Sequence, residues 1–235
     1  MRNLAFASFI VLAGCVSTTS TEAPKAQAPK QTTKAVKPTE AQVSRFWSVV
    51  NSMEPVVEKV CRERTQNVNC DFKVVIDDRP SPYPNAFQTV DKTGRPIMGF
   101  NNAMIADARN RDEIAFVMGH ETAHHIEQHL VEQRNNAIAG AIVLGGLAAL
   151  TGASSSGVDA ASRLGADVGR RSYSKNQELE ADALGTVITH RAGFNPLRGA
   201  EFFNRIPDPG DRFLGTHPPN KERIETVRRV NATLN

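Results

Sequence analysis

The chain has 235 residues, enough for one well-buried domain and too few for two of ordinary size once its ends are set aside. Its formal net charge of +3 is small. Because the arginines are also scattered along the chain, the composition excludes the dense basic surface of a nucleic-acid-binding protein.

The first residues have the character of a secretory signal. Arg2 is followed by an apolar run from Leu4 to Ala13, which is too short to stay in a bilayer as a span. The segment LAGC, which ends at Cys15, resembles the bacterial lipobox, in which the chain is cut before the cysteine and the cysteine is lipidated. Val16 stands where an aspartate would resemble an inner-membrane retention signal, so the resemblance implies a lipoprotein at the periplasmic face of the outer membrane. A plain cleaved signal is the alternative.

The next segment reads as a disordered tether, because Thr, Ala, Pro and Lys dominate it and large apolar side chains are missing. Four lysines against two glutamates make it mildly basic. A tether of about 25 residues has a root-mean-square reach of roughly 25 to 30 Å. We therefore expect a lipoprotein signal peptide over residues 1–14, a lipidated cysteine with a disordered tether over residues 15–40, and one folded domain over residues 41–235.

The folded part opens with a predicted helix and strand. Apolar residues recur every three or four positions over residues 40–64, which predicts a helix that bends or restarts at Pro55. The segment DFKVVID, residues 71–77, alternates apolar and polar side chains and is typical of a half-buried strand. In an oxidising periplasm Cys61 and Cys70 are expected to form one disulfide between these elements; two free thiols are the alternative.

Two short strands and further helices come next. The segments NAFQTV, residues 85–90, and RPIMGF, residues 95–100, are joined by DKTG, whose composition suits a hairpin turn. Helices are predicted over residues 111–131 and from about Asn220. The sequence therefore predicts one α+β domain with many helices and three short strands.

A long uncharged run covers residues 137–153, at the lower edge of the length of a membrane span. A Gly/Ser segment, TGASSSG, follows it and reads as a loop. We expect a buried helix or a lid close to the active site, with a membrane contact as the alternative.

The chemistry of the chain is concentrated in two short segments. GHETAHH places His120 and His124 one helical turn apart, so both imidazoles can bind one zinc ion. Glu121 would project beside the metal, where a general base can take a proton from an activated water. ELEAD offers Glu178 as a third ligand and Asp182, one turn later, as the acceptor of a ligating histidine's outer N–H. The alternative, a solvated helix with incidental histidines, does not account for the second pair.

The other histidines are expected to have different roles. His125 and His129 point away from the direction shared by the zinc-binding pair, so we expect structural or surface positions for them. His190 is close to a predicted helix end and is expected to be a cap or a surface residue.

Three groups of segments resemble a known family. FVMGHETAHHIEQH, ELEADALG with RAGFNP, and THPPNKERI are similar to the HtpX and CAAX prenyl protease group of gluzincin zinc metallopeptidases, which includes Oma-type enzymes, in its soluble periplasmic lipoprotein branch. The resemblance covers about residues 40–232, with the motifs in the family order. It implies a mainly helical α+β zincin domain with a small three-stranded sheet beside the active-site cleft. Residues 85–87, NAF, match a family segment before the strand that borders this cleft.

The resemblance also implies a role for each matched residue. The positions that hold the family's single zinc ion match His120, His124 and Glu178. The position of the catalytic base matches Glu121, and the residue behind the ligands matches Asp182.

His217 precedes PP in a predicted loop and matches a family position that approaches the metal. It could fill the open position on zinc and hold the enzyme inactive until the loop moves. The alternative is that it donates a hydrogen bond to the developing oxyanion. We expect the first of these roles.

These features predict a zinc-dependent endopeptidase. An extended substrate would pair with a strand at the cleft edge, for which RPIMGF is the expected candidate. The resemblance points to envelope quality control, so the expected substrates are misfolded or stalled periplasmic and outer-membrane proteins. The alternative is a zinc-stabilised chaperone or adaptor for outer-membrane protein assembly with little proteolysis. Glu121 favours the enzyme, because a purely structural zinc site does not need a base.

Overall fold

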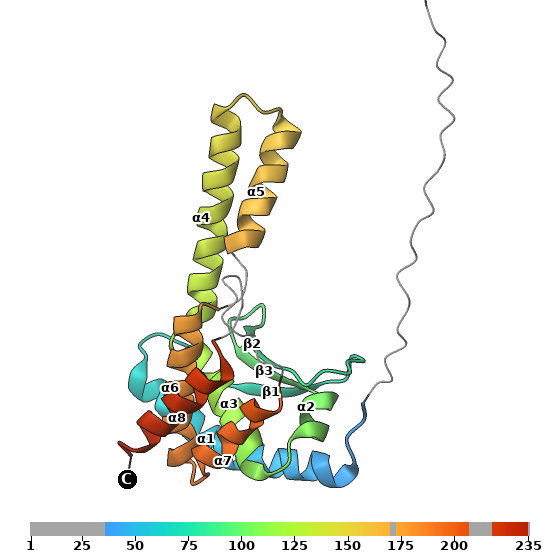
Figure 1. Cartoon of the computed structure of the whole chain (residues 1–235), viewed down its shortest axis with the longest axis vertical. Helices are drawn as coiled ribbons and strands as arrows, with labels where there is room; N and C mark the ends of the chain where they lie inside the picture. Colours follow the sequence, from blue (N-terminus) through green and yellow to red (C-terminus); the bar gives the residue numbers. More distant parts are fainter. Residues whose placement is uncertain (1–35, 170–172, 207–217, 235) are drawn as a thin grey trace, which may run out of the picture. The chain divides into compact units, whose positions relative to one another are not determined.

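The computed structural model describes residues 36–169, 173–206 and 218–234. The expected signal peptide, Cys15, most of the tether and His217 lie outside the described residues. Figure 1 shows a first helix, then three strands, then a succession of helices. The bounds are α1 Glu40–Arg64, β1 Lys73–Asp77, β2 Ala86–Val90, β3 Pro96–Asn101, α2 Asn102–Asp107, α3 Arg111–Ile126, α4 His129–Leu150, α5 Ser155–Gly169, α6 Lys175–Arg191, α7 Pro196–Gly199, the 3-10 helix η1 Ala200–Asn204 and α8 Asn220–Asn231.

The predicted helix over residues 40–64 is present as α1, which is continuous through Pro55, so of the two expected alternatives there, a bend or a restart, the restart is wrong. The apolar side chains on both sides of the proline, Met53 and Val57, are fully buried. Their burial offsets the one backbone hydrogen bond that proline cannot donate. A disulfide between Cys61 and Cys70, with Cα atoms 5.8 Å apart, ties the last turn of α1 to the segment that enters β1.

The sheet has the strand order β1-β3-β2, with β1 parallel and β2 antiparallel to β3. The turn between β2 and β3 closes at Gly94, whose φ of 83° favours glycine, and the predicted hairpin is present. Because β3 is paired along both edges, it has no edge for a substrate strand. The expectation that RPIMGF borders the cleft is therefore wrong: alternation reveals a strand but not its place in a sheet. The edge nearer to the histidines is that of β2.

The predicted helix over residues 111–131 is interrupted. Helix α3 ends at Ile126, Gln128 takes a left-handed conformation with φ of 58°, and α4 starts at His129. The periodicity of the sequence continues across this point, but the backbone changes direction. As a result, His129 turns back towards His124.

Close packing of α3 on α6 positions the chemical groups. A Cβ added at Gly119 would lie 2.9 Å from the carbonyl oxygen of Gly185, and one added at Gly185 would lie 2.9 Å from the backbone nitrogen of His120. Glycine at both positions lets the two backbones approach more closely than larger residues would allow. This contact brings Glu178 of α6 beside the histidines of α3.

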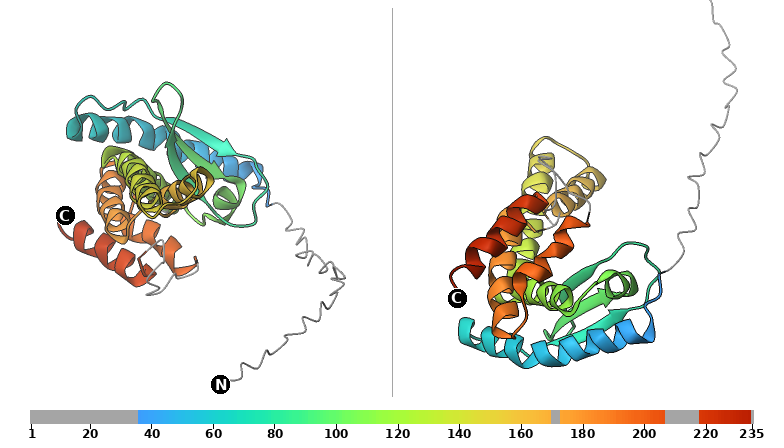
Figure 2. Two further views of the ribbon diagram at one scale, coloured as in Figure 1. Left: turned by 90° about the horizontal axis from the view of Figure 1, so that it is seen from above. Right: turned by 60° about the horizontal axis from the view of Figure 1, so that its bottom comes forward.

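Helices α4 and α5 form a two-helix hairpin, seen from three directions in Figures 1 and 2. Of the expected alternatives for residues 137–153, the buried helix is wrong, because within that run only Gly145 is buried. The lid remains a prediction. The loop after it is shorter than expected, since α5 already starts at Ser155. Within the ranges that the structure describes, no helix has the length and apolar content needed to cross a bilayer.

The main core lies between α1, α3, α6 and the sheet. Phe46 of α1 meets Phe100 of β3 edge to face, with ring centroids 5.0 Å apart, and Phe116 of α3 meets Phe203 of η1 in the same way. The predicted fold class is confirmed: a mainly helical α+β domain with a small three-stranded sheet.

Candidate metal centre

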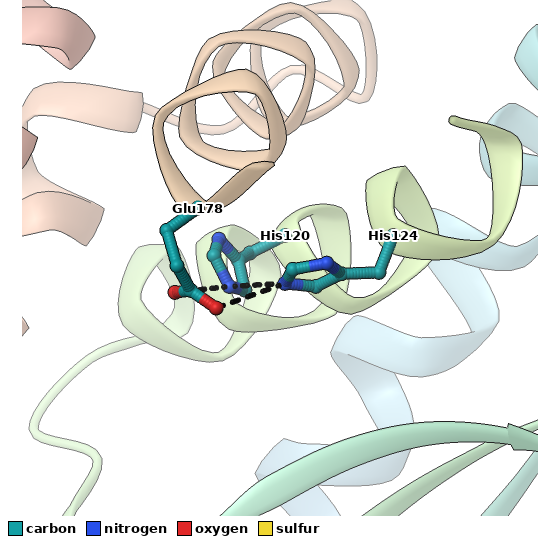
Figure 3. A group of neighbouring side chains, drawn as sticks. All are labelled: His120, His124 and Glu178. Carbon is teal, nitrogen blue, oxygen red and sulfur yellow. Dashed lines mark hydrogen bonds and ion pairs between the residues drawn. The ribbon is translucent and has the colours of Figure 1, made fainter. Parts of the chain in front are cut away.

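Three buried side chains from α3 and α6 converge on one point (Figure 3). The Nε2 atoms of His120 and His124 are 3.0 Å apart. Each of these nitrogens lies 3.6 Å from an oxygen of Glu178. One donor atom from each residue falls within 4.8 Å of the others.

The chemistry of this donor set fits a bound metal ion. Two imidazole nitrogens and one carboxylate oxygen are the combination found in many catalytic sites that keep an open fourth position. Imidazole also suits transition metals better than calcium or magnesium, which prefer oxygen ligands. The three side chains would therefore hold the metal, with room for a further ligand.

An ion pair behind His120 fixes the orientation of its ring. Asp182 Oδ1 lies 2.9 Å from His120 Nδ1, and Arg223 of α8 donates to both oxygens of Asp182 at 2.7 Å. If His120 donates Nδ1–H to the carboxylate, its Nε2 lone pair faces Glu178 and His124. The side chains of His120, Asp182 and Arg223 are all buried.

The electrostatics agree with an ionised Asp182. Burial raises the pKa of this carboxyl group, but the charge and hydrogen bonds of Arg223 and the bond to His120 lower it more, and the pKa lies below its ordinary value. Burial lowers the pKa of His120, yet the bond and charge of Asp182 outweigh it and the pKa is raised. Asp182 therefore carries the negative charge that holds His120 and Arg223 together.

A second chain of contacts holds His124. Its Nδ1 lies 2.9 Å from Nδ1 of His129, whose Nε2 lies 3.2 Å from Glu180 Oε2. One set of tautomers satisfies every contact: His124 donates Nδ1–H to His129, and His129 donates Nε2–H to Glu180. His124 then keeps its Nε2 lone pair for a metal. His129 is 1% exposed, so of the two expected roles, structural or surface, it has the structural one, because the reversal at Gln128 buries it.

Replacing His129 by alanine is expected to weaken metal binding about ten- to a hundredfold, the usual effect of losing a ligand's outer hydrogen-bond partner. The reason is that His124 loses the acceptor that holds its ring and tautomer. The metal dissociation constant, measured by competition with a chromogenic chelator, tests this. Peptidase activity should recover when excess metal is added.

His190→Ala is the matched control, since His190 lies in the last turn of α6. His129→Gln, which offers a carbonyl oxygen to His124, should restore most of the affinity. If His129→Ala binds metal as tightly as the parent chain, His129 does not position His124.

Glu121 borders a cavity of about 410 Å³ next to the three donors. His120 and Glu178 also line it, and apolar side chains such as Phe116 and Phe203 form part of its wall. Ala86, the first residue of β2, and the segment before it line the cavity as well, which places the start of this edge strand beside the donors. The arrangement offers an acid–base group, a metal-binding triad and an apolar recess in one place.

Tyr173 covers the ring of one of the three donors, His124. Its ring stacks on His124, with centroids 3.9 Å apart and planes 19° apart. Burial, and then the negative charges of Glu121 and Glu178, raise the pKa of its hydroxyl group well above the ordinary value. The hydroxyl therefore stays protonated and can donate a hydrogen bond.

Two other histidines discussed in the sequence analysis are His125 and His217. His125 bonds the carbonyl of Asn69 at 2.8 Å and approaches Gln88, which is a structural position away from the triad. His217 is outside the described residues. Sequence reasoning missed Arg223, although it belongs to the segment THPPNKERI, and it assigned no role to Tyr173.

Comparison with known proteins gives independent evidence about the family of this chain. Residues 50–231 match peptidase family M48. A Vibrio cholerae protein provisionally named a beta-barrel assembly-enhancing protease is 29% identical over 204 residues, covering 78% of this chain and 42% of that protein. The beta-barrel assembly-enhancing protease of Escherichia coli O157:H7 is 28% identical over 150 residues, covering 54% of this chain and 29% of that protein.

A mitochondrial relative is also similar. The metalloendopeptidase OMA1 of Saccharomyces cerevisiae is 29% identical over 168 residues, 66% of this chain and 45% of that protein. The chain thus spans less than half the length of these relatives. The family match itself extends over most of the chain, from α1 to the end of α8. This chain therefore belongs to peptidase family M48 and is a metallopeptidase.

Proposed function

We propose that this metallopeptidase is a zinc endopeptidase that cleaves misfolded or stalled proteins of the bacterial envelope. The observation that carries the proposal is that Glu121 lines the same cavity as the His120 and Glu178 donors, beside the open edge of β2. A metal site kept only for stability would not need a carboxylate base at the wall of an apolar recess.

His120, His124 and Glu178 would hold the zinc ion, as their donor set and burial suggest. When bound, zinc supplies a Lewis acid that polarises the scissile carbonyl group and lowers the pKa of the attacking water. The chain's own contribution is to keep both histidine Nε2 lone pairs aimed at one point. Asp182 does this for His120, and His129 does it for His124.

Glu121 is the general base in this proposal. It takes one proton from the attacking water and later gives a proton to the amine nitrogen that leaves, so it ends each cycle ionised. The apolar wall of the cavity excludes bulk water and strengthens these electrostatic interactions. The ring of Tyr173 stacks on His124 and helps to hold that imidazole in place.

Substrate would bind in extended form along β2. β2 uses one edge to pair with β3, and among the described strands its other edge has no partner. Backbone pairing of this kind requires an unfolded segment and reads the main chain more than the side chains. A preference for unfolded polypeptides over folded proteins follows.

The names of two relatives support outer-membrane proteins as the substrate class, since both refer to beta-barrel assembly. The lipobox-like segment before Cys15 supports a location at the periplasmic face of the outer membrane, with a signal peptide over residues 1–14 and a tether over residues 15–40. In this arrangement the metallopeptidase domain begins at residue 41 and is held close to the membrane in which such substrates assemble.

The proposal predicts that an outer-membrane β-barrel protein is cut at least about tenfold faster when diluted from urea than when folded in detergent micelles. Only the unfolded form can add an extended segment to β2. Fragment formation followed by gel electrophoresis measures both rates. A chelator should stop the reaction and zinc should restore it.

Equal cleavage of the two forms would rule out recognition of unfolded chains. Suppression of substrate aggregation without any fragments would favour the alternative function, a zinc-stabilised chaperone or adaptor. The metal content of the same samples identifies the ion.

A further inference from the structure

Large apolar side chains on the α4–α5 hairpin are exposed rather than buried. The exposed fraction is 68% for Ile142, 57% for Leu147 and 88% for Leu150. The other large apolar residues exposed on the hairpin are Val131, Ile138, Val143, Leu164 and Val168. In a helix pair that lies in water, such side chains face the partner helix, because contact removes them from water.

Small residues occupy the contact between the two helices instead. A Cβ added at Gly140 would lie 2.2 Å from the carbonyl oxygen of Gly165, and one added at Gly145 would lie 2.1 Å from the hydroxyl of Ser162. The helix backbones are therefore in close contact, while the leucines, isoleucines and valines face outwards. This distribution is characteristic of helix pairs surrounded by lipid, where small residues form the contact and large apolar ones meet acyl chains.

The charged residues of the α4–α5 hairpin are placed as expected for a helix pair at a bilayer surface. The sequence has no charged residue between Arg134 and Asp159, a stretch that covers most of α4 and the tip of the hairpin. On α5, Asp159, Arg163 and Asp167 repeat every four residues and form one exposed charged stripe. A pair in which most of one helix, α4 beyond Arg134, is uncharged and the other helix has one charged stripe fits a position in the membrane interface.

We propose that the α4–α5 hairpin docks on a lipid bilayer, with the outward face of α4 in contact with the acyl chains and the charged stripe of α5 in water. A protein partner fits less well. Protein interfaces carry a polar rim and about one hydrogen bond per 100–200 Å². Beyond Arg134, α4 has no charged residue that could contribute to such a rim.

The dimensions of the chain agree with this position. α4 has 22 residues and is therefore about 33 Å long. A flexible tether of about 25 residues attached to a lipid at Cys15 would keep the domain within roughly 25 to 30 Å of the membrane, so the outward face of α4 can reach the bilayer. The docking inference uses the proposed location but not the proposed peptidase reaction, so the two can fail separately.

Vesicle binding by the chain from Val16 onwards tests the docking without the signal peptide and without any attached lipid. We expect this protein to float with vesicles of a zwitterionic phospholipid in about 1 M salt, a concentration that screens exposed charges. Under that condition the basic tether contributes little. Combining Ile142→Ser, Leu147→Ser and Leu150→Ser should reduce the bound fraction at least about tenfold, because three acyl-chain contacts are lost.

A matched control combines Ile142→Leu, Leu147→Ile and Leu150→Ile, which keep the surface apolar and should bind as the parent does. Cleavage of a short peptide should be unchanged in both triple variants, because the three residues lie outside the metal centre. Helical circular dichroism verifies that the serine variant is folded.

Fluorescence provides a second readout that does not depend on weakening the hairpin. Trp47 is the single tryptophan of the chain, so Trp47→Phe with Leu150→Trp places one fluorophore at the end of α4. Its emission should shift to the blue when vesicles are added. The emission of Trp47 in the parent chain, on α1, should not shift.

Either of two results would overturn the inference. The first is vesicle binding that the serine variant retains in full or that the parent lacks. The second is a parent chain that is dimeric without lipid and becomes monomeric in the serine variant, which would assign the exposed face to a second copy of the chain.

Discussion

Glu121→Gln is expected to lower kcat/KM on an unfolded substrate by at least about a hundredfold while zinc stays bound. Glutamine has nearly the same shape but cannot take a proton from the attacking water. The three donors are unaltered, because Glu121 lines the cavity and is not one of them. Cleavage rates and the metal-to-protein ratio, determined on the same sample, give the two readouts.

Glu127→Gln serves as the matched control for this variant. Glu127 follows the last residue of α3 and lies 3.9 Å from Arg64, so it is not part of the cavity wall. It should retain full activity. If Glu121→Gln keeps both zinc and the parental rate, the proposed base is wrong and another group must accept the proton.

Glu178→Ala should lose metal and activity together. The loss of affinity should exceed the roughly ten- to hundredfold effect of losing an outer hydrogen-bond partner, because a direct ligand is removed. Two histidines alone make a weak site, and Arg223, 3.5 Å from Glu178, would then repel a cation with less compensation. Equilibrium dialysis against buffered zinc and cleavage of the unfolded substrate measure the two losses.

Glu225→Ala removes an exposed carboxylate from α8 and should change neither property. Far-ultraviolet circular dichroism of Glu178→Ala should match that of the parent, since the core of α3 and α6 does not depend on this side chain. Full zinc occupancy in Glu178→Ala would mean that a different residue supplies the third ligand.

Much of the metal centre followed from helical periodicity. Four-residue spacing places His120 with His124 on one face of α3, and Glu178 with Asp182 on one face of α6, whatever the rest of the fold. The predicted family and the predicted enzyme class, a metallopeptidase, are confirmed. These properties depend on local geometry and on short motifs, each of which occupies a few neighbouring residues.

The outer contacts of the ligands could not be derived in this way. Arg223 reaches Asp182 because α8 packs on α6, and His129 reaches His124 because the backbone reverses at Gln128. Periodicity alone gave one continuous helix across Gln128 and so directed His129 away from the site. A single left-handed residue changes the direction of everything after it, and its effect depends on the packing that it allows.

The sequence by itself determined the chemical class of the protein, the two helix faces that carry donors, and the alternation that marks its strands. Only the tertiary structure decided that β3 is central among the described strands, so that the strand edge beside the donors belongs to β2, and that the uncharged run of α4 is exposed. The physical reason is the same in both cases. The local pattern of apolar and polar residues shows which side chains favour burial. The partner that covers a strand edge or an apolar face comes from distant parts of the chain or, for α4, from its surroundings.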